Sequence, residues 1–135
     1  MRFTRGAARA VIGEIHAADH ALDVDRFLAL LAPTVCFQLG SQPQLHGLAA
    51  VRGAVDGLFR SLAGVEHALR DFWLGERTIV FQADVTYTLP GRPQIVLPYV
   101  DVLRMSGQLL VEDYRIFIDL SPLMAALSDA EPRPR

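Results

Sequence analysis

The stretch Pro98-Tyr99-Val100-Asp101-Val102-Leu103-Arg104-Met105 has the composition of a buried β-strand with one carboxylate, Asp101, near its centre. Tyrosine, valine and leucine surround this acid, so its side chain loses hydration unless it is paired, bound to a ligand, or protonated with a raised pKa. These outcomes require either a lined interior cavity or a structural ion pair. Arg104 and Arg115 are the candidate ion-pair partners, and the residues alone leave both interpretations open.

Strand-like segments continue through the second half of the chain. We predict strands at residues 66–74, 78–89, 94–105 and 109–120. Glycine and proline in the short connections supply the turns between them, and such short connections imply antiparallel pairing.

The first half is mainly helical. Helical spacing of apolar residues predicts helices at 4–21, 24–31 and 48–62, with a short strand at 35–39. Helices followed by a meander predict an α+β fold, in which three N-terminal helices pack on one face of a strongly curved antiparallel sheet. We expect a single domain over residues 1–127 and a disordered C-terminal tail over residues 128–135.

Composition excludes several classes of function. The 135 residues are 51% hydrophobic and 21% charged, with a net charge of −2. No basic stripe is present, which excludes the usual mode of nucleic-acid binding. All 13 basic residues are arginine, so neither a Schiff-base lysine nor a phosphate-loop lysine is available.

The single cysteine, Cys36, excludes an internal disulfide and a multi-cysteine zinc site. No apolar run approaches the length of about 18 residues that a membrane span requires. We therefore expect no membrane partner, and the reducing cytoplasm is the default location.

Both faces of the segments 99–105 and 114–120 are apolar. Helices cover only one face of the predicted sheet, and a large apolar patch facing water is unusual for a monomer. We therefore expect a homodimer that forms through the sheet.

This pattern of elements resembles the nuclear transport factor 2-like superfamily, a cystatin-like fold. The resemblance covers nearly the whole chain, and its marks are the segments 23–32, 46–47, 100–104 and 114–120. Within the superfamily the chain looks most like the SnoaL-like group of polyketide cyclases and related small proteins. The resemblance implies a conical half-barrel with an interior pocket and no cofactor, but it leaves the reaction open.

Each known chemistry of these relatives is incomplete in this chain. Resemblance to ketosteroid isomerases places Asp101 in the pocket, but the isomerase base falls near Phe37 and the helix-one tyrosine falls near Ile15. Resemblance to limonene-type epoxide hydrolases aligns Asp84 with one aspartate but puts Ile116 at the position of the second. The cyclase pair lacks a histidine in the last strands.

The strand alternation nevertheless defines a candidate pocket. The proposed catalytic residues are Asp101, Asp84 and Tyr114. Period-two alternation from Asp101 and the resemblance together give the proposed ligand-binding residues, which are Tyr99, Phe37, Trp73, Ile116, His46, Leu97 and Leu103. On the last strand, the resemblance puts Glu112 and Ile118 on the same face. For Asp84 a solvated sheet face remains an equal alternative, and one of Phe72 and Trp73 faces the pocket.

The four histidines show no metal-binding motif. His16 and His20 are four residues apart on one helix, but the glutamate of a zinc-protease motif is missing, so we expect no metal.

Three functions stay open. The first is a cofactor-independent isomerase, cyclase, hydrolase or dehydratase acting on a hydrophobic oxygenated compound such as a polyketide, terpenoid or steroid-like molecule. The others are a binding module without turnover and a structural dimer with a filled pocket.

Overall fold

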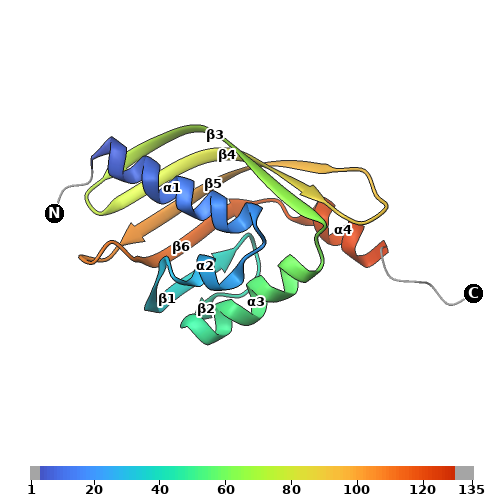
Figure 1. Ribbon diagram of the computed structural model, residues 1–135, viewed down its shortest axis with the longest axis horizontal. Helices are drawn as coiled ribbons and strands as arrows, with labels where there is room; N and C mark the ends of the chain where they lie inside the picture. Colours follow the sequence, from blue (N-terminus) through green and yellow to red (C-terminus); the bar gives the residue numbers. More distant parts are fainter. Residues whose placement is uncertain (1–3, 130–135) are drawn as a thin grey trace, which may run out of the picture.

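The computed structural model describes residues 4–129, except for the side chain of Asp129. Three helices come first: α1 (Arg5–His20), α2 (Val24–Leu28) and α3 (Leu48–Arg60), with β1 (Leu31–Leu39) and β2 (Leu45–His46) between the last two. The strands β3 (Gly64–Gly75), β4 (Thr78–Thr88), β5 (Ile95–Met105) and β6 (Val111–Ile118) follow, and α4 (Ser121–Asp129) ends the described part of the chain (Figure 1).

Side chains cap the starts of α1 and α2. Thr4 accepts a hydrogen bond from the backbone N–H of Ala7 at 3.0 Å, and Asp23 accepts one from the backbone N–H of Arg26 at 3.0 Å. Both caps satisfy backbone donors that a helix start leaves unpaired. Their positions fix where α1 and α2 begin against the sheet.

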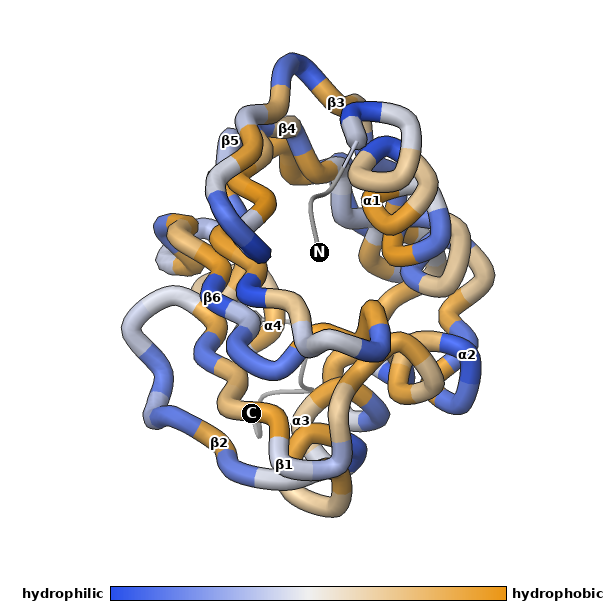
Figure 2. The backbone as a smooth tube through the Cα atoms, turned by 90° about the vertical axis from the view of Figure 1, so that its left-hand side faces the viewer, coloured by the Kyte–Doolittle hydropathy of each residue, from blue (hydrophilic) through white to orange (hydrophobic). Residues whose placement is uncertain are grey.

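The six strands form one curved sheet in the order β2-β1-β6-β5-β4-β3. Neighbouring strands are antiparallel except β1 and β6, which pair in parallel. The sheet curves from β3 to β1, and α1, α2 and α3 close its open side (Figure 2). This arrangement confirms the predicted α+β fold with three helices on a curved sheet.

Alternation along the strands divides the sheet into two faces. In β5, Leu97, Tyr99, Asp101, Leu103 and Met105 are buried, and the residues between them point outward. The inward side chains pack against the apolar faces of the helices. The interior of the cone is therefore built from every second residue of each strand.

Two features of the C-terminal part were not predicted. The sequence predicts one strand over residues 109–120, but β6 ends at Ile118. The helix α4 begins at Ser121, whose backbone N–H donates a hydrogen bond to Asp119 Oδ1 at 3.0 Å. Ser128 and Asp129, which the sequence places in the tail, belong to α4. The rest of the predicted tail, residues 130–135, lies outside the described residues.

Candidate functional site

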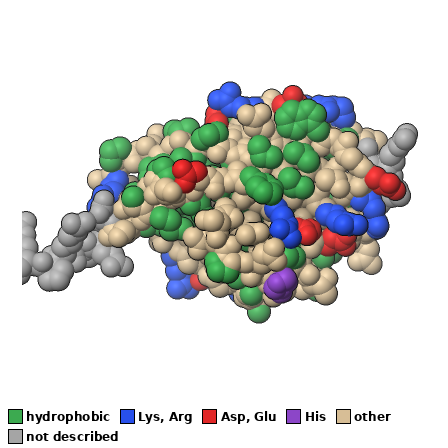
Figure 3. Space-filling model, turned by 180° about the vertical axis from the view of Figure 1, so that it is seen from behind, with side chains coloured by type: hydrophobic (Ala, Val, Ile, Leu, Met, Phe, Trp, Pro, Cys, Tyr) green, Lys and Arg blue, Asp and Glu red, His purple; other side chains and the backbone are tan. Residues whose placement is uncertain are grey.

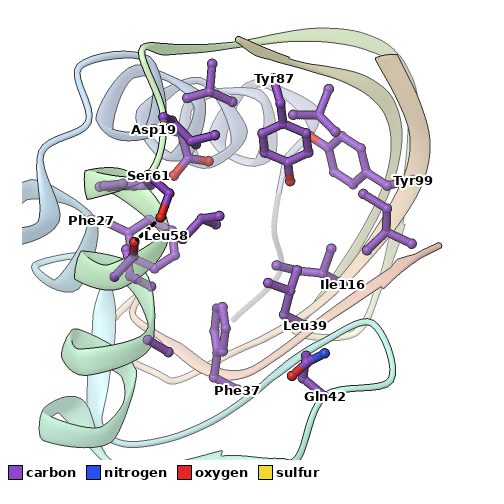
Figure 4. Close-up of a pocket in the computed structure, with 18 of the residues that line it drawn as sticks. Asp19, Phe27, Phe37, Leu39, Gln42, Leu58, Ser61, Tyr87, Tyr99 and Ile116 are labelled. Carbon is purple, nitrogen blue, oxygen red and sulfur yellow. Dashed lines mark hydrogen bonds between the residues drawn. The ribbon is translucent and has the colours of Figure 1, made fainter. Parts of the chain in front are cut away.

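A cavity of about 410 Å³ lies between the concave face of the sheet and the helices. Its wall is mainly apolar and includes Phe27, Phe37, Leu39, Val55, Leu58 and Ile116 (Figure 4). A cavity of this size suits a small molecule. The described side chains do not fill this space, which removes the hypothesis of a pocket occupied by the protein's own residues.

Asp101 lines the cavity from β5 and is only 2% exposed. Desolvation raises the pKa of its carboxyl well above the usual value. The hydrogen bond from the Tyr114 hydroxyl opposes this rise, and the nearby charge of Asp19 adds to it. One carboxyl oxygen, Oδ1, is buried without a hydrogen-bond partner. A buried polar atom without a partner destabilises the folded protein unless a ligand or a water molecule forms a hydrogen bond with it.

The structure argues against the ion-pair interpretation of Asp101. Arg104 Nε lies 3.5 Å from Glu112 Oε1, and Arg115 Nε lies 3.0 Å from Asp113 Oδ1. Both arginines occupy outward positions of their strands, whereas Asp101 points to the opposite, inner face of the sheet. Asp101 is therefore held by Tyr114 and faces the cavity.

A second carboxylate, Asp19, reaches the cavity from the last turn of α1. Desolvation raises its pKa from 3.8 to about 7. The sequence interpretation missed this residue, although a signal was present. Asp19 continues the apolar stripe of Ala8, Ile12 and Ile15 at spacings of four, three and four residues, which marks the buried face of α1. An acid on that stripe is an acid in the interior.

Two histidines support this end of the cavity. The rings of His16 and His67 stack with their centroids 4.5 Å apart and their planes at 8°. His16 Nε2 lies 3.0 Å from the Tyr99 hydroxyl, and His67 Nε2 lies 3.7 Å from Asp19 Oδ2. Desolvation lowers the pKa of His16 to about 4 and that of His67 to about 3. Both imidazoles are therefore neutral at pH 7.

Three tyrosines complete the polar end. Desolvation raises the pKa values of Tyr87, Tyr99 and Tyr114, and the charge of Asp101 adds to this rise in each case. The phenols therefore stay neutral and serve as hydrogen-bond donors or acceptors. Two carboxyls, two neutral imidazoles and three phenols thus share one end of an otherwise apolar space.

Half of the ten predicted site residues reach this space. Asp101, Tyr114, Tyr99, Phe37 and Ile116 line the cavity. They come together because β1, β5 and β6 are neighbours in the sheet.

Other predicted residues face inward without reaching the cavity. Leu97 and Leu103 are buried on the same face of β5 but pack into the core. Glu112 does not continue the inward face of β6, because the register with β5 shifts there and Val111 and Tyr114 are both buried. Such a bulge adds one residue and reverses the alternation beyond it.

Three predicted site residues lie away from the cavity. Asp84 is on the outer face of β4, where it accepts a hydrogen bond from Arg70 Nε at 2.8 Å. Trp73 also points outward and is 49% exposed, whereas Phe72 is the buried member of that pair. His46 is exposed on β2. The structure thus corrects the predicted pocket at Asp84, Trp73 and His46, because each lies on the solvent side of its strand.

Within residues 4–129, no group of three or more His, Cys, Asp or Glu side chains is placed to hold a metal ion. In the same range, no helix is long and apolar enough to cross a membrane.

Comparisons with known proteins agree with this architecture. A model of the SnoaL-like domain family matches residues 12–113. A search of curated proteins gave no match. Among solved structures, a protein of unknown function with a nuclear transport factor 2-like fold from Burkholderia pseudomallei K96243 is 19% identical with a TM-score of 0.78, over 90% of this chain and 97% of that chain.

Two enzymes are also similar in structure. An epoxide hydrolase of M. tuberculosis, related to limonene epoxide hydrolase, is 11% identical with a TM-score of 0.72, over 90% of each chain. An epoxide hydrolase/cyclase-like enzyme of pyran ring formation in the polyether salinomycin is 15% identical with a TM-score of 0.75, over 86% of this chain and 93% of that chain. At these identities the likeness shows a shared fold alone.

Proposed function

The chain belongs to the SnoaL-like domain family, and from this premise we propose that it is a cofactor-independent enzyme that moves a proton on a hydrophobic, oxygenated small molecule. The observation that carries the proposal is the pair of carboxyls, Asp19 and Asp101, in one apolar cavity. Environments that separate the pKa values of two acids assign them different roles in catalysis.

Asp19 is suited to the role of general base. Its pKa of about 7 leaves a substantial fraction ionised at neutral pH while keeping the carboxylate basic enough to accept a proton. Neutral His67 borders it and does not neutralise its charge. The ionised Asp19 can therefore take a proton from a carbon next to a carbonyl group.

Asp101 is suited to the complementary role. Desolvation raises the pKa of its carboxyl well above the usual value, which favours the protonated form, and Tyr114 is its hydrogen-bond partner. The free Oδ1 atom is then available to carry the acidic proton toward a ligand. A neutral carboxylic acid in that position donates a hydrogen bond to the carbonyl oxygen and stabilises the enolate as negative charge develops there.

The resulting reaction class follows from these two roles. Asp19 removes the proton, the electron pair moves onto the carbonyl oxygen, and Asp101 stabilises that oxygen. Where the enolate is conjugated with a carbon–carbon double bond, return of the proton from Asp19 to the far carbon gives isomerisation. Where the next carbon carries a hydroxyl group, that group takes the proton from Asp19 and leaves as water, the enolate electrons form the new double bond, and the result is dehydration. A cavity of about 410 Å³ with a mainly apolar wall suits a polyketide, terpenoid or steroid-like compound.

Deuterium exchange tests this proposal without knowledge of the natural substrate. Tetralone and anthrone, incubated with the protein in D₂O, should gain deuterium next to the carbonyl group faster than in buffer, as followed by NMR. Asp19→Asn and Asp101→Asn should abolish the gain, while Asp84→Asn, on the outer face, should retain it. Exchange that persists in both cavity variants contradicts the assignment, and binding of the ketones without exchange supports a noncatalytic binding module.

We also propose that two copies associate through the outer face of the sheet. Hydrophobic side chains gather on the back of the molecule, where arginines and acids lie beside them (Figure 3). Phe117 is 59% exposed, and it pairs in register with Val100 on β5. Trp73, 49% exposed, pairs with Val80 on β4. Apolar side chains on neighbouring strands of one face suit an interface between like subunits.

A further inference from the structure

The polar end of the cavity contains groups that can be negative or neutral at physiological pH. The side chains that contribute to it are Asp19 and His16 from α1, His67 from β3, Tyr87 from β4, Tyr99 and Asp101 from β5, and Tyr114 from β6. His16 bonds to the hydroxyl of Tyr99 rather than lining the space. Among the described residues that line the cavity, none is an arginine, and the chain has no lysine.

From this distribution we infer that the cavity selects its ligands by charge, binding an apolar molecule that carries a protonated amine between Asp19 and Asp101 and rejecting the corresponding carboxylate. The inference rests on the proposed function in placing the substrate at the same two acids. It adds a basic nitrogen to the class of hydrophobic compound that the site accepts.

The unsatisfied atom of Asp101 supports this assignment. Its Oδ1 is buried without a partner, and Tyr114 is the hydrogen-bond partner of the carboxyl. An ammonium group carries several N–H donors and no acceptor, and its charge lowers the pKa of a nearby carboxyl. When Asp101 loses its proton on binding the amine, Oδ1 can accept a hydrogen bond from the ammonium group, as ionised Asp19 does. An anionic ligand would instead place its negative charge beside ionised Asp19 in a poorly hydrated space.

The aromatic groups favour the same ligand. Tyr87 and Tyr99 line the cavity beside the acids, and Figure 4 shows both rings on the side of the cavity that Asp19 also faces. Faces of aromatic rings attract cations, and the attraction increases when water is excluded. The two rings thus add to the preference for a cation without adding charge.

Thermodynamic reciprocity gives the expected size of the effect. An opposite charge within a few ångströms lowers the pKa of a carboxyl by about 1 to 3 units. The same coupling strengthens binding of the cation to the ionised acid by about tenfold or more. Because Asp19 has a pKa of about 7, affinity for an amine should rise as the pH increases toward 8.

Calorimetric titration with three matched probes tests the inference. Phenylbutylamine, phenylbutanol and phenylbutanoate share an apolar body and differ in the charge of the head group. At about pH 8 the amine should bind about tenfold more tightly than the alcohol, and the carboxylate about tenfold more weakly. Between about pH 5.5 and about pH 8, affinity for the amine should rise about tenfold, with little change for the alcohol.

Variants separate the contribution of each acid. Asp19→Asn should remove most of the tenfold advantage of the amine over the alcohol, and Asp101→Asn should reduce it by about threefold, while the alcohol still binds to both variants. Retained binding of the alcohol also shows that each variant is folded. Asp84→Asn, which changes an acid on the outer face of the sheet, away from the cavity, should behave like the wild type.

Equal affinities for the amine and the alcohol would overturn the inference, as would an amine advantage that survives in both cavity variants, or the absence of binding by all three probes. Ketone exchange in D₂O is measured separately. Exchange that depends on Asp19 and Asp101, found together with no preference for the amine, would refute charge selection and leave the proposed function standing. An amine preference without ketone exchange would support charge selection and refute the proposed function.

Discussion

Replacement of Asp19 by asparagine should stabilise the protein at neutral pH, although it removes a residue that we assign to catalysis. The cavity holds the carboxyl where only 16% of its side chain is exposed, and desolvation raises its pKa from 3.8 to about 7. In the unfolded chain the carboxyl is hydrated and ionises normally. Ionised Asp19 therefore favours unfolding, whereas an amide has no charge to desolvate.

The size and sign of the effect follow from the two pKa values. Between about pH 4 and about pH 7 the folded state binds more protons at Asp19 than the unfolded state, so the contribution of Asp19 to stability falls as the pH rises. A change in pKa from 3.8 to about 7 corresponds to about 4 kcal/mol for full ionisation. Partial exposure and burial of the replacement amide reduce the expected gain to about 2 to 3 kcal/mol.

Urea unfolding followed by circular dichroism, repeated from about pH 4 to about pH 8, measures this contribution. The stability of Asp19→Asn relative to the wild type should rise through this range and level off near pH 8. Asp84→Asn is the matched control, because it removes a carboxylate on the outer face of the sheet whose partner, Arg70, is itself exposed, so that their ion pair contributes about 1 kcal/mol or less. A difference between Asp19→Asn and the wild type that is independent of pH would refute the desolvation argument.

Three further predictions concern the surroundings of the two acids and the outer face. Tyr114→Phe removes the hydrogen-bond donor to Asp101, so urea unfolding should show a loss of about 1 to 2 kcal/mol, and an unchanged stability would contradict that contact. NMR titration should find the imidazoles of His16 and His67 neutral down to about pH 5, and protonation near pH 6.5 would show that burial does not act on them. Phe117→Arg should convert a dimer to a monomer in sedimentation equilibrium, and a monomeric wild type would contradict the proposed interface.

The direction of Asp101 could be predicted because strand alternation and the family resemblance gave the same answer. The structure places it in the cavity with Tyr99, as expected. Alternation alone was not sufficient at Asp84. A strand with polar residues on one face does not reveal whether that face meets a cavity or water, and in β4 it meets water.

Local irregularities set a second limit. The bulge at Glu112 changes which residues of β6 face inward, and the sequence there contains no glycine or proline to mark it. The sequence does not predict α4, because the apolar residues before it have the pattern of a strand up to Leu120. Pro122, in the first turn of α4, was the readable sign of a helix start.

Asp19 was missed for a different reason. The family resemblance points to the strands for a second acid, whereas this chain supplies a carboxylate from the buried face of α1. The apolar stripe of that helix could have identified it without any structure.

The central claim is that Asp19 and Asp101 form a pair of acids with separated pKa values in one cavity. Carbon NMR of protein labelled at the aspartate carboxyl groups, assigned with the Asp19→Asn and Asp101→Asn variants, measures both pKa values directly. The account predicts that Asp101 is protonated at pH 7 and that Asp19 titrates near pH 7. Titration of both carboxyls near the ordinary value of about 3.9 would contradict it.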